Sequence, residues 1–316
     1  MTSDFKRLIS EIKEKWDDCL KNSPDIFRYV LNISKEKILE GKFNFLVQLN
    51  KDRATKRRKP EKFLSITPVF DSDKFNFTKI DKREILFERI LLESKLNTSF
   101  IINNSPLTKY HILIVPNCDS CLAQIMTKDC LEIAFNIMTS TDDKSIKIGY
   151  NSPGALASVN HLHLHLLYIE HDLYVEDVEL VQLVDNFYRI DNKKYPIEGF
   201  CMILRDVKND VEKLYKVVQY CCDKVIPHNI FFTKSRDAKE IRIFFFPRQL
   251  NNFGENKIYS THLNVAFCEL SGFIPIGDDE LYESITEEYV LRRFADEIGL
   301  ICIDIENDLK NIVASN

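Results

Sequence analysis

The sequence contains little glycine, only 8 residues among 316, and no low-complexity tract. With 22 phenylalanines and 45% apolar residues, no long stretch is expected to stay disordered. No run of about 18 uninterrupted apolar residues occurs, which excludes an ordinary membrane-spanning helix. The opening residues Met-Thr-Ser-Asp-Phe-Lys are not followed by an apolar run, so no signal peptide is predicted.

An excess of positive charge and a cysteine framework are also missing. The net charge is −5, so the overall charge indicates neither nucleic acid nor a membrane as a partner. Nine cysteines are an odd number without regular spacing, which is typical of reduced thiols, and we expect a cytoplasmic protein. Cys118 and Cys121 have the spacing of half a zinc site, but no second such pair exists, so ordinary packing is favoured over zinc.

The periodicity of the apolar residues predicts helices and strands in two halves that pack as one body. We expect an N-terminal helical segment over 1–40, a first half over 41–190 and a second half over 191–316. Helices are predicted at 3–20, 121–138 and 279–298. Strands are predicted at 98–102, 110–116, 146–150, 159–168, 200–204, 228–233, 241–246 and 263–270.

A basic segment occupies residues 51–60, with the sequence Lys-Asp-Arg-Ala-Thr-Lys-Arg-Arg-Lys-Pro. A solvated loop is the favoured interpretation, because runs of charge usually face water. A loop that contacts phosphate and a nuclear-import signal are the alternatives.

Three of the seven histidines alternate with leucine at 161–165. In a strand, residues two apart face the same way, so His161, His163 and His165 are predicted to line one face. Such a row could supply imidazoles to zinc, although no carboxylate occurs nearby before Glu170. It could equally supply a nucleophile that attacks phosphorus, because a neutral imidazole has a free lone pair.

These residues resemble a known family. His161-Leu-His-Leu-His-Leu-Leu167 matches the histidine-triad pattern, and the segment Gly149–Asn160 before it resembles that of the GDP-D-glucose phosphorylases, relatives of the plant GDP-L-galactose phosphorylases. Further matches are Phe45–Asn50, Lys74–Lys79, Asn104–Pro106, His111–Pro116 and Glu269–Gly272. The resemblance implies an α+β fold: a histidine-triad or galactose-uridylyltransferase-like antiparallel sheet with flanking helices, built from two fused repeats of which the second is degenerate.

The resemblance also implies roles for individual residues. His163 would be the covalent nucleophile, His161 would fix its orientation, and His165 would sit against the scissile phosphate bridge. Asn151 would contact the ribose and Ser158 the phosphate. Without the resemblance, Asn151 would be interpreted as a turn residue and Ser158 as a small residue packed beside the strand.

The implied reaction is phosphorolysis of GDP-D-glucose through a guanylyl-histidine intermediate, with inorganic phosphate as the second substrate and no metal or other cofactor. Alternatives are a hydrolase of the same superfamily and a nucleotide-binding protein without activity; the presence of all three histidines argues against the latter. A homodimer is possible for a triad protein, although two fused repeats could supply the same geometry in one chain.

Some positions depart from the family pattern. An aromatic-glycine pair usually precedes the strand at 111, where this chain has Lys109-Tyr110, so that turn is expected to differ. Leu166-Leu167 replace a Gly-Tyr pair after the triad. In the second half, strand 241–246 would correspond to the triad strand but has no histidine; Arg242 or Arg248 could contribute to an anion site, with a surface salt bridge favoured.

Overall fold

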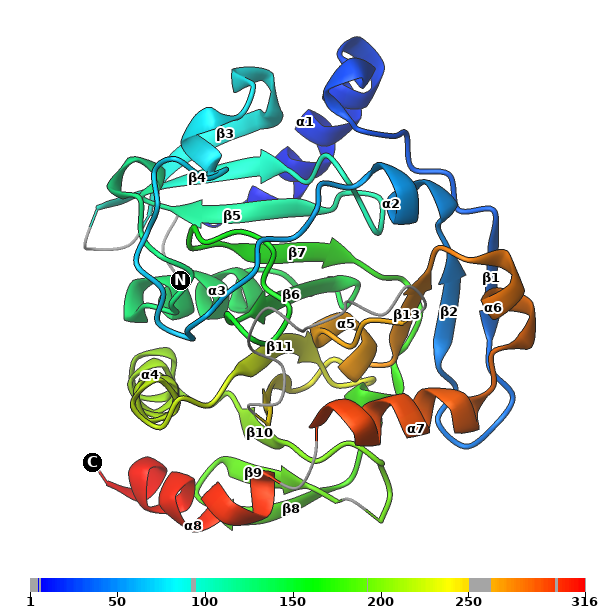
Figure 1. Cartoon of the computed structure of the whole chain (residues 1–316). Coiled ribbons are helices and arrows are strands. Elements are labelled where there is room, and N and C mark those ends of the chain that lie inside the picture. Colours follow the sequence, from blue (N-terminus) through cyan, green and yellow to red (C-terminus); the bar gives the residue numbers. More distant parts are fainter. Residues whose placement is uncertain are drawn as a thin grey trace.

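A continuous antiparallel sheet of ten strands forms the centre of the computed structural model, which describes residues 5, 7–91, 95–191, 193–249, 263–298 and 301–315 (Figure 1). Its strand order is β3-β4-β5-β7-β6-β11-β12-β10-β9-β8. The strands are β3 Ile85–Leu91, β4 Leu96–Ile102, β5 Ile112–Pro116, β6 Ile146–Asn151, β7 Leu164–Tyr168, β8 Leu180–Val184, β9 Phe187–Ile190, β10 Phe200–Ile203, β11 His228–Lys234 and β12 Ile241–Pro247. The α+β class with a large antiparallel sheet is thereby confirmed.

The two halves of this sheet have the same order of elements. The chain runs β3-β4-β5-helix-β6-β7 in one half and β8-β9-β10-helix-β11-β12 in the other, and the last two strands exchange places in both. The halves meet where β6 pairs with β11. In this arrangement β12 takes the place that β7 has in the first half, as expected for strand 241–246. That the halves are repeats of one unit, and the domain limits at 40 and 190, stay predictions.

Helices cover one face of the sheet and bury a large apolar core against it. They are α1 Leu8–Asn22, α3 Lys128–Thr139, α4 Val207–Asp223 and α8 Ile301–Ala314. Along α1 the buried side chains Leu8, Ile12 and Trp16 repeat at a spacing of four, which is the stripe that a helix needs to face a core. No helix in the described part of the chain has both the length and the apolar character needed to cross a membrane.

A smaller layer covers part of the opposite face (Figure 1). It consists of a three-stranded sheet and short helices: β1 Lys35–Ile38, β2 Leu46–Leu49, β13 Phe273–Ile276, α5 Phe267–Leu270, α6 Asp279–Ser284 and α7 Glu287–Ile298. The helix α2, Lys51–Lys56, follows β2, and 3-10 turns occur at Pro24–Ile26, Phe77–Lys79, Lys82–Glu84, Cys118–Ser120 and Tyr174–Asp177.

Alternation along β7 decides which side chains face each layer. Leu164 and Leu166 belong to the core under the helices, whereas Leu167 belongs to the core of the smaller layer. His165 therefore projects toward the smaller layer, between Leu113 of β5 and Gly149 of β6 in register. A side chain at Gly149 would meet the Phe267 ring at 2.2 Å, so glycine lets α5 approach the sheet beside His165.

Several predicted elements differ in their limits. The helix expected at 121–138 begins only at Lys128, where Thr127 accepts the first capping hydrogen bond. The helix expected at 279–298 is divided into α6 and α7. The strand predicted at 263–270 is wrong, because α5 forms there and β13 follows it. The strand at 159–168 begins only at Leu164, so His161 and His163 lie in the segment that leads into β7.

Candidate active site

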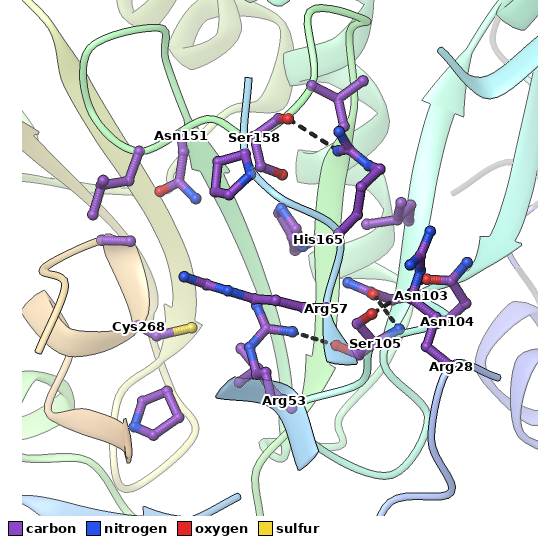
Figure 2. A pocket seen from close by; sticks show the side chains of 18 of the residues that line it. Arg28, Arg53, Arg57, Asn103, Asn104, Ser105, Asn151, Ser158, His165 and Cys268 are labelled. Atoms are coloured by element: carbon purple, nitrogen blue, oxygen red, sulfur yellow. Dashed lines mark hydrogen bonds between the residues drawn. The ribbon is translucent and has the colours of Figure 1, made fainter. Parts of the chain in front are cut away.

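A cavity of about 400 Å³ opens between the first half of the large sheet and the smaller layer. Its walls come from segments far apart in the sequence: α2, the ends of β4 and β6, the approach to β7, and α5 (Figure 2). Of the predicted site residues, His163, His165, Asn151 and Ser158 line it. The sequence positions named for a site are thus brought together, with the exception of His161.

His163 presents one ring nitrogen to the cavity because the other is occupied. Its Nδ1 lies 2.7 Å from the carbonyl oxygen of His161, and a carbonyl only accepts, so Nδ1 carries the proton. The neutral ring then has its lone pair on Nε2. Gln124 fixes the backbone here, since its Oε1 accepts from the His163 N–H at 2.9 Å and its Nε2 donates to the Asn151 carbonyl at 3.1 Å. This geometry suits a nucleophile.

His165 has the opposite tautomer, and His111 determines it. The Leu107 N–H donates to His111 Nδ1 at 3.0 Å, so a neutral His111 carries its proton on Nε2. That Nε2 lies 3.1 Å from His165 Nδ1 and 3.0 Å from Asn103 Nδ2. The Asn103 Oδ1 accepts from the Ser105 N–H, so its Nδ2 is a donor and the His111 proton goes to His165 Nδ1. His165 Nε2 therefore carries a proton, as a hydrogen-bond donor requires.

His161 is fully buried and does not line the cavity. Its ring packs against Phe70 and Phe77, at centroid distances of 5.4 and 5.3 Å, and its Nδ1 accepts from the Phe77 N–H at 3.1 Å. The part of His161 that touches the nucleophile is its backbone carbonyl. The prediction of three imidazoles on one strand face is therefore wrong: β7 begins at Leu164, so of the three only His165 lies on the strand, and the His161 ring packs against Phe70 and Phe77 instead of lining the cavity.

Burial keeps these imidazoles uncharged at neutral pH. It lowers the pKa of His163 to about 4 and that of His161 to about 4. It also lowers the pKa of His111 and of His165 well below the ordinary value, with neighbouring charge from Arg53 acting in the same direction. The rings are therefore neutral at pH 7, and their hydrogen-bond partners determine which nitrogen carries the proton.

Asn151 and Ser158 lie on the side of the cavity that faces α5 and α2. The Asn151 Oδ1 accepts from Asn229 Nδ2 at 2.6 Å and from the Phe267 N–H at 3.3 Å, so the group it can offer a ligand is Nδ2. The Ser158 carbonyl accepts from Arg58 Nη2 at 3.0 Å. Both residues line the cavity, and the ribose and phosphate contacts that the resemblance implies for them stay predictions.

The basic segment at 51–60 is not a solvated loop. Its first residues form α2, capped by the Asn50 side chain, and Arg53, Arg57 and Arg58 line the cavity. Arg53 Nη1 donates to the Ser105 carbonyl. Figure 2 shows the guanidinium groups of Arg53 and Arg57 between His165 and Cys268. Such a concentration of positive charge beside a nucleophile favours an anionic ligand.

Apolar side chains and two carboxylates complete the walls. The apolar members that line the cavity include Phe75, Phe77, Ile80, Ile101 and Leu113. Glu84 accepts from Asn104 Nδ2 at 3.1 Å, and burial raises its pKa. Glu269 accepts from the Ala266 N–H at 2.8 Å, and burial raises its pKa to about 7. An apolar wall together with several polar groups is typical of a small-molecule site.

The cysteine and arginine positions named from the sequence lie outside this cavity. Cys118 and Cys121 are half-buried, and the described residues contain no group of three or more His, Cys, Asp or Glu side chains placed to hold a metal ion. Arg242 pairs with Glu240 at 2.8 Å. Arg248 is fully buried and pairs with Glu297 at 3.1 Å, so the expected surface salt bridge is wrong for this residue.

Tyr110 corrects another expectation. The turn before β5 was expected to differ without glycine, yet Tyr110 itself adopts the left-handed conformation, with φ 59°. Its ring packs against Trp16 of α1 at 5.5 Å and Tyr168 at 5.5 Å, and its hydroxyl donates to Asp17 at 3.0 Å. These contacts offset the strain of a bulky residue at positive φ. Leu166 and Leu167 are core residues that do not line the cavity.

Local sequence patterns missed His111 and Gln124 as parts of the site, and they gave phosphate contact by the basic segment only as an alternative. His111 stands at the start of a predicted strand, but its contact with His165 depends on how β5 pairs with β7. Gln124 lies in an irregular segment without any motif. The basic run was the usable signal for the arginines, and only the tertiary fold shows which way they point.

Comparison with known proteins identifies relatives along most of the chain. Family models described as "GDPGP1-like, N-terminal domain" and "GDPGP1-like, C-terminal domain" match residues 7–167 and 184–300. The chain is 34% identical to GDP-D-glucose phosphorylase 1 of Danio rerio, with 88% of this chain and 83% of that protein covered. It is 32% identical to the Homo sapiens protein of the same name, with 83% and 72% covered.

Plant and yeast proteins extend the comparison. GDP-L-galactose phosphorylase 2 of Arabidopsis thaliana is 28% identical, with 89% of this chain and 70% of that protein covered. Among solved structures, yeast Ap4A phosphorylase Apa2 in complex with Ap4A has a TM-score of 0.64 at 18% identity, covering 92% of this chain and 96% of that chain. The last likeness concerns the fold of the two chains.

Proposed function

This chain belongs to the GDPGP1-like family, and from that premise we propose that it is a nucleotidyltransferase that cleaves GDP-D-glucose with inorganic phosphate. The products are GDP and glucose 1-phosphate. One observation carries the chemistry: two adjacent imidazoles in a cavity rich in arginine have opposite tautomers, His163 with a free lone pair and His165 with a proton to donate.

In the first step, His163 Nε2 attacks the α-phosphorus of the nucleotide sugar. A bond forms between nitrogen and phosphorus, and the bond to the bridging oxygen breaks, with its electron pair leaving on glucose 1-phosphate. His165 Nε2–H donates a hydrogen bond to that departing oxygen. The ring of His163 becomes positively charged, and the His161 carbonyl at 2.7 Å from Nδ1 stabilises this charge.

In the second step, inorganic phosphate attacks the same phosphorus. The bond to His163 breaks, the electron pair returns to Nε2, and GDP leaves. Arg53, Arg57 and Arg58 line the cavity, and their positive charge suits the negative charge of GDP-glucose, of the guanylyl group on His163 and of inorganic phosphate. This chain's residues thus supply a nucleophile, a hydrogen-bond donor and positive charge for both steps of the transfer.

Product analysis tests the proposal. Purified protein is incubated with GDP-glucose, with and without phosphate, and GDP, GMP and glucose 1-phosphate are measured. Formation of GDP that depends on phosphate is expected. Formation of GMP without phosphate would indicate the hydrolase instead, and an absence of turnover would indicate a binding protein.

A variant tests the covalent step. His163→Ala should abolish turnover while the folded structure is retained, because the ring's partners within the described ranges are only the His161 carbonyl and neighbouring aromatic rings. Mass spectrometry of wild-type protein quenched in the absence of phosphate should show one guanylyl group, and none on the variant. A fully active His163→Ala protein would refute the covalent mechanism.

A further inference from the structure

Arg248 is a buried charged residue to which the proposed reaction gives no role. It is 0% exposed, it follows β12 in the second half of the chain, and it does not line the cavity. Its Nη1 donates to Asn229 Oδ1 at 3.1 Å and to the Val265 carbonyl at 2.6 Å, and its Nη2 contacts Glu297 at 3.1 Å. A buried ion pair usually adds little net stability compared with apolar packing, so stability alone does not explain a guanidinium here.

Asn229 connects this arginine to the site. It lies on β11, directly opposite Asn151 on β6, at the junction of the two halves of the sheet. Its Nδ2 donates to Asn151 Oδ1 at 2.6 Å and to the Ala155 carbonyl at 2.8 Å. A guanidinium only donates and a carbonyl only accepts, so Arg248 and Ala155 together determine which end of the Asn229 amide is oxygen.

The orientation of Asn151 follows from that of Asn229. The Asn229 Nδ2 and the Phe267 N–H are both donors, so Asn151 must turn its Oδ1 toward them. Its Nδ2 then faces the cavity. An asparagine amide can rotate by half a turn with almost no change in shape, and the reversed amide would present a carbonyl oxygen to an anionic nucleotide.

We propose that Arg248 and Asn229 are positioning residues, which hold the Asn151 amide so that a hydrogen-bond donor faces the nucleotide. The second half of the chain thus acts on the first through a relay of hydrogen bonds that runs from the Arg248 guanidinium to the Asn229 amide and from there to the Asn151 amide. The inference rests on the proposed function only in that the ligand is a nucleotide, whose ribose and phosphate oxygens accept hydrogen bonds.

A double-mutant cycle between positions 151 and 229 tests this relay. The variants are Asn151→Ala, Asn229→Ala, Asn229→Asp and the corresponding doubles. Asn229→Asp keeps an acceptor for Arg248 but turns an acceptor toward Asn151, so it should reverse the Asn151 amide in a folded protein. Asn186→Ala is the matched control. Asn186 is another buried asparagine, directly before β9, and its Nδ2 donates to Asp210 Oδ1 at 2.8 Å, away from the cavity.

The expected result is a loss of about tenfold in kcat/KM for each single change at 151 or 229, the effect of one hydrogen bond. In the Asn151→Ala background, neither change at 229 should lower kcat/KM further. Asn186→Ala should lower the melting temperature and leave kcat/KM unchanged. The Kd of GDP is measured by calorimetry for the same set of variants. The relay is then tested even if the wild-type protein shows no phosphorolysis.

Two results would overturn the inference. One is a folded Asn229→Asp protein with wild-type kcat/KM and GDP affinity. The other is a loss at 229 that multiplies with the loss at 151, since a residue that acts only through Asn151 cannot have an effect after the amide has been removed. If the wild-type protein is inactive but the Kd of GDP shows the expected double-mutant cycle, the proposed phosphorylase activity is rejected and the relay is retained.

Discussion

Acid should destabilise this protein, and His228 offers a clean measure of the effect. The residue is buried on β11, does not line the cavity, and packs against Tyr150 and Phe245 at 5.9 and 5.2 Å. Burial lowers its pKa from the ordinary 6.5 to about 4. Between these two values the unfolded chain binds a proton that the native protein does not, so the free energy of unfolding falls as the pH falls through this window.

The magnitude follows from the two pKa values. At pH 5 the unfolded imidazole is almost fully protonated, whereas the native ring holds about 0.1 proton on average. Integration from pH 8 to pH 5 gives a loss of about 2 kcal/mol for this one group. That is a substantial share of the 5–15 kcal/mol or so by which a typical domain is stable.

His228→Phe removes this titration and keeps an aromatic ring in the stack. Urea unfolding of both proteins at pH 8 and pH 5 measures the effect. The variant should lose about 2 kcal/mol less than the wild type between the two pH values, even if the lost hydrogen bond to the Ile226 carbonyl lowers its stability at both. Glu269, whose raised pKa of about 7 acts with the opposite sign, affects both proteins equally.

The pH dependence of unfolding in the two proteins shows whether the native His228 ring is neutral at pH 5. An unchanged pH dependence in His228→Phe would show that the native ring already binds a proton at pH 5, which contradicts its burial as a neutral group. Activity at pH 8 should be the same in both proteins, because the residue lies outside the cavity, and this measurement confirms that the variant is folded.

Further predictions concern the site. His111→Phe should lower kcat about tenfold, because His165 loses the donor that determines its tautomer. In steady-state assays of both variants, His111→Phe should lose less activity than His165→Phe. The release of glucose 1-phosphate in the absence of phosphate should keep its rate from pH 7 to pH 5 and fall toward pH 4, since protonation of His163 removes the lone pair; a fall centred near 6.5 in rapid-quench measurements would contradict this. Arg57→Ala should raise the KM of GDP-glucose and weaken its dependence on salt, and an unchanged KM across a salt titration would exclude Arg57 from anion binding.

The local pattern predicted a row of histidines but could not decide between a metal site and a nucleophile, and that choice came from the family resemblance. Alternation correctly separated His165 from Leu164 and Leu166, because that rule depends only on the strand itself. The role of His111 depends on the register in which Leu113 faces His165, which is a long-range property. The tautomers in turn depend on individual backbone groups, such as the Leu107 N–H, that no local pattern reveals.

The errors have a common physical origin. Residues 263–270 are rich in apolar side chains, and short apolar runs do not distinguish a buried strand from a buried helix. The capping contact between Glu269 and the Ala266 N–H, with Gly149 leaving room for Phe267, selects the helix α5. In the same way, a charge run indicates polarity but not direction; here Arg53 of α2 and the two arginines that follow the helix, Arg57 and Arg58, line the cavity.

The pairing of β6 with β11 has a consequence for the integrity of the chain. The strand that ends in Asn151 lies in the interior of a ten-stranded sheet only because the second half continues it. If the first half were produced alone, β6 would become an open edge with unsatisfied backbone groups, and such edges recruit further strands. A separated first half would therefore tend to pair with another copy or to aggregate, and the second half protects the first from self-association.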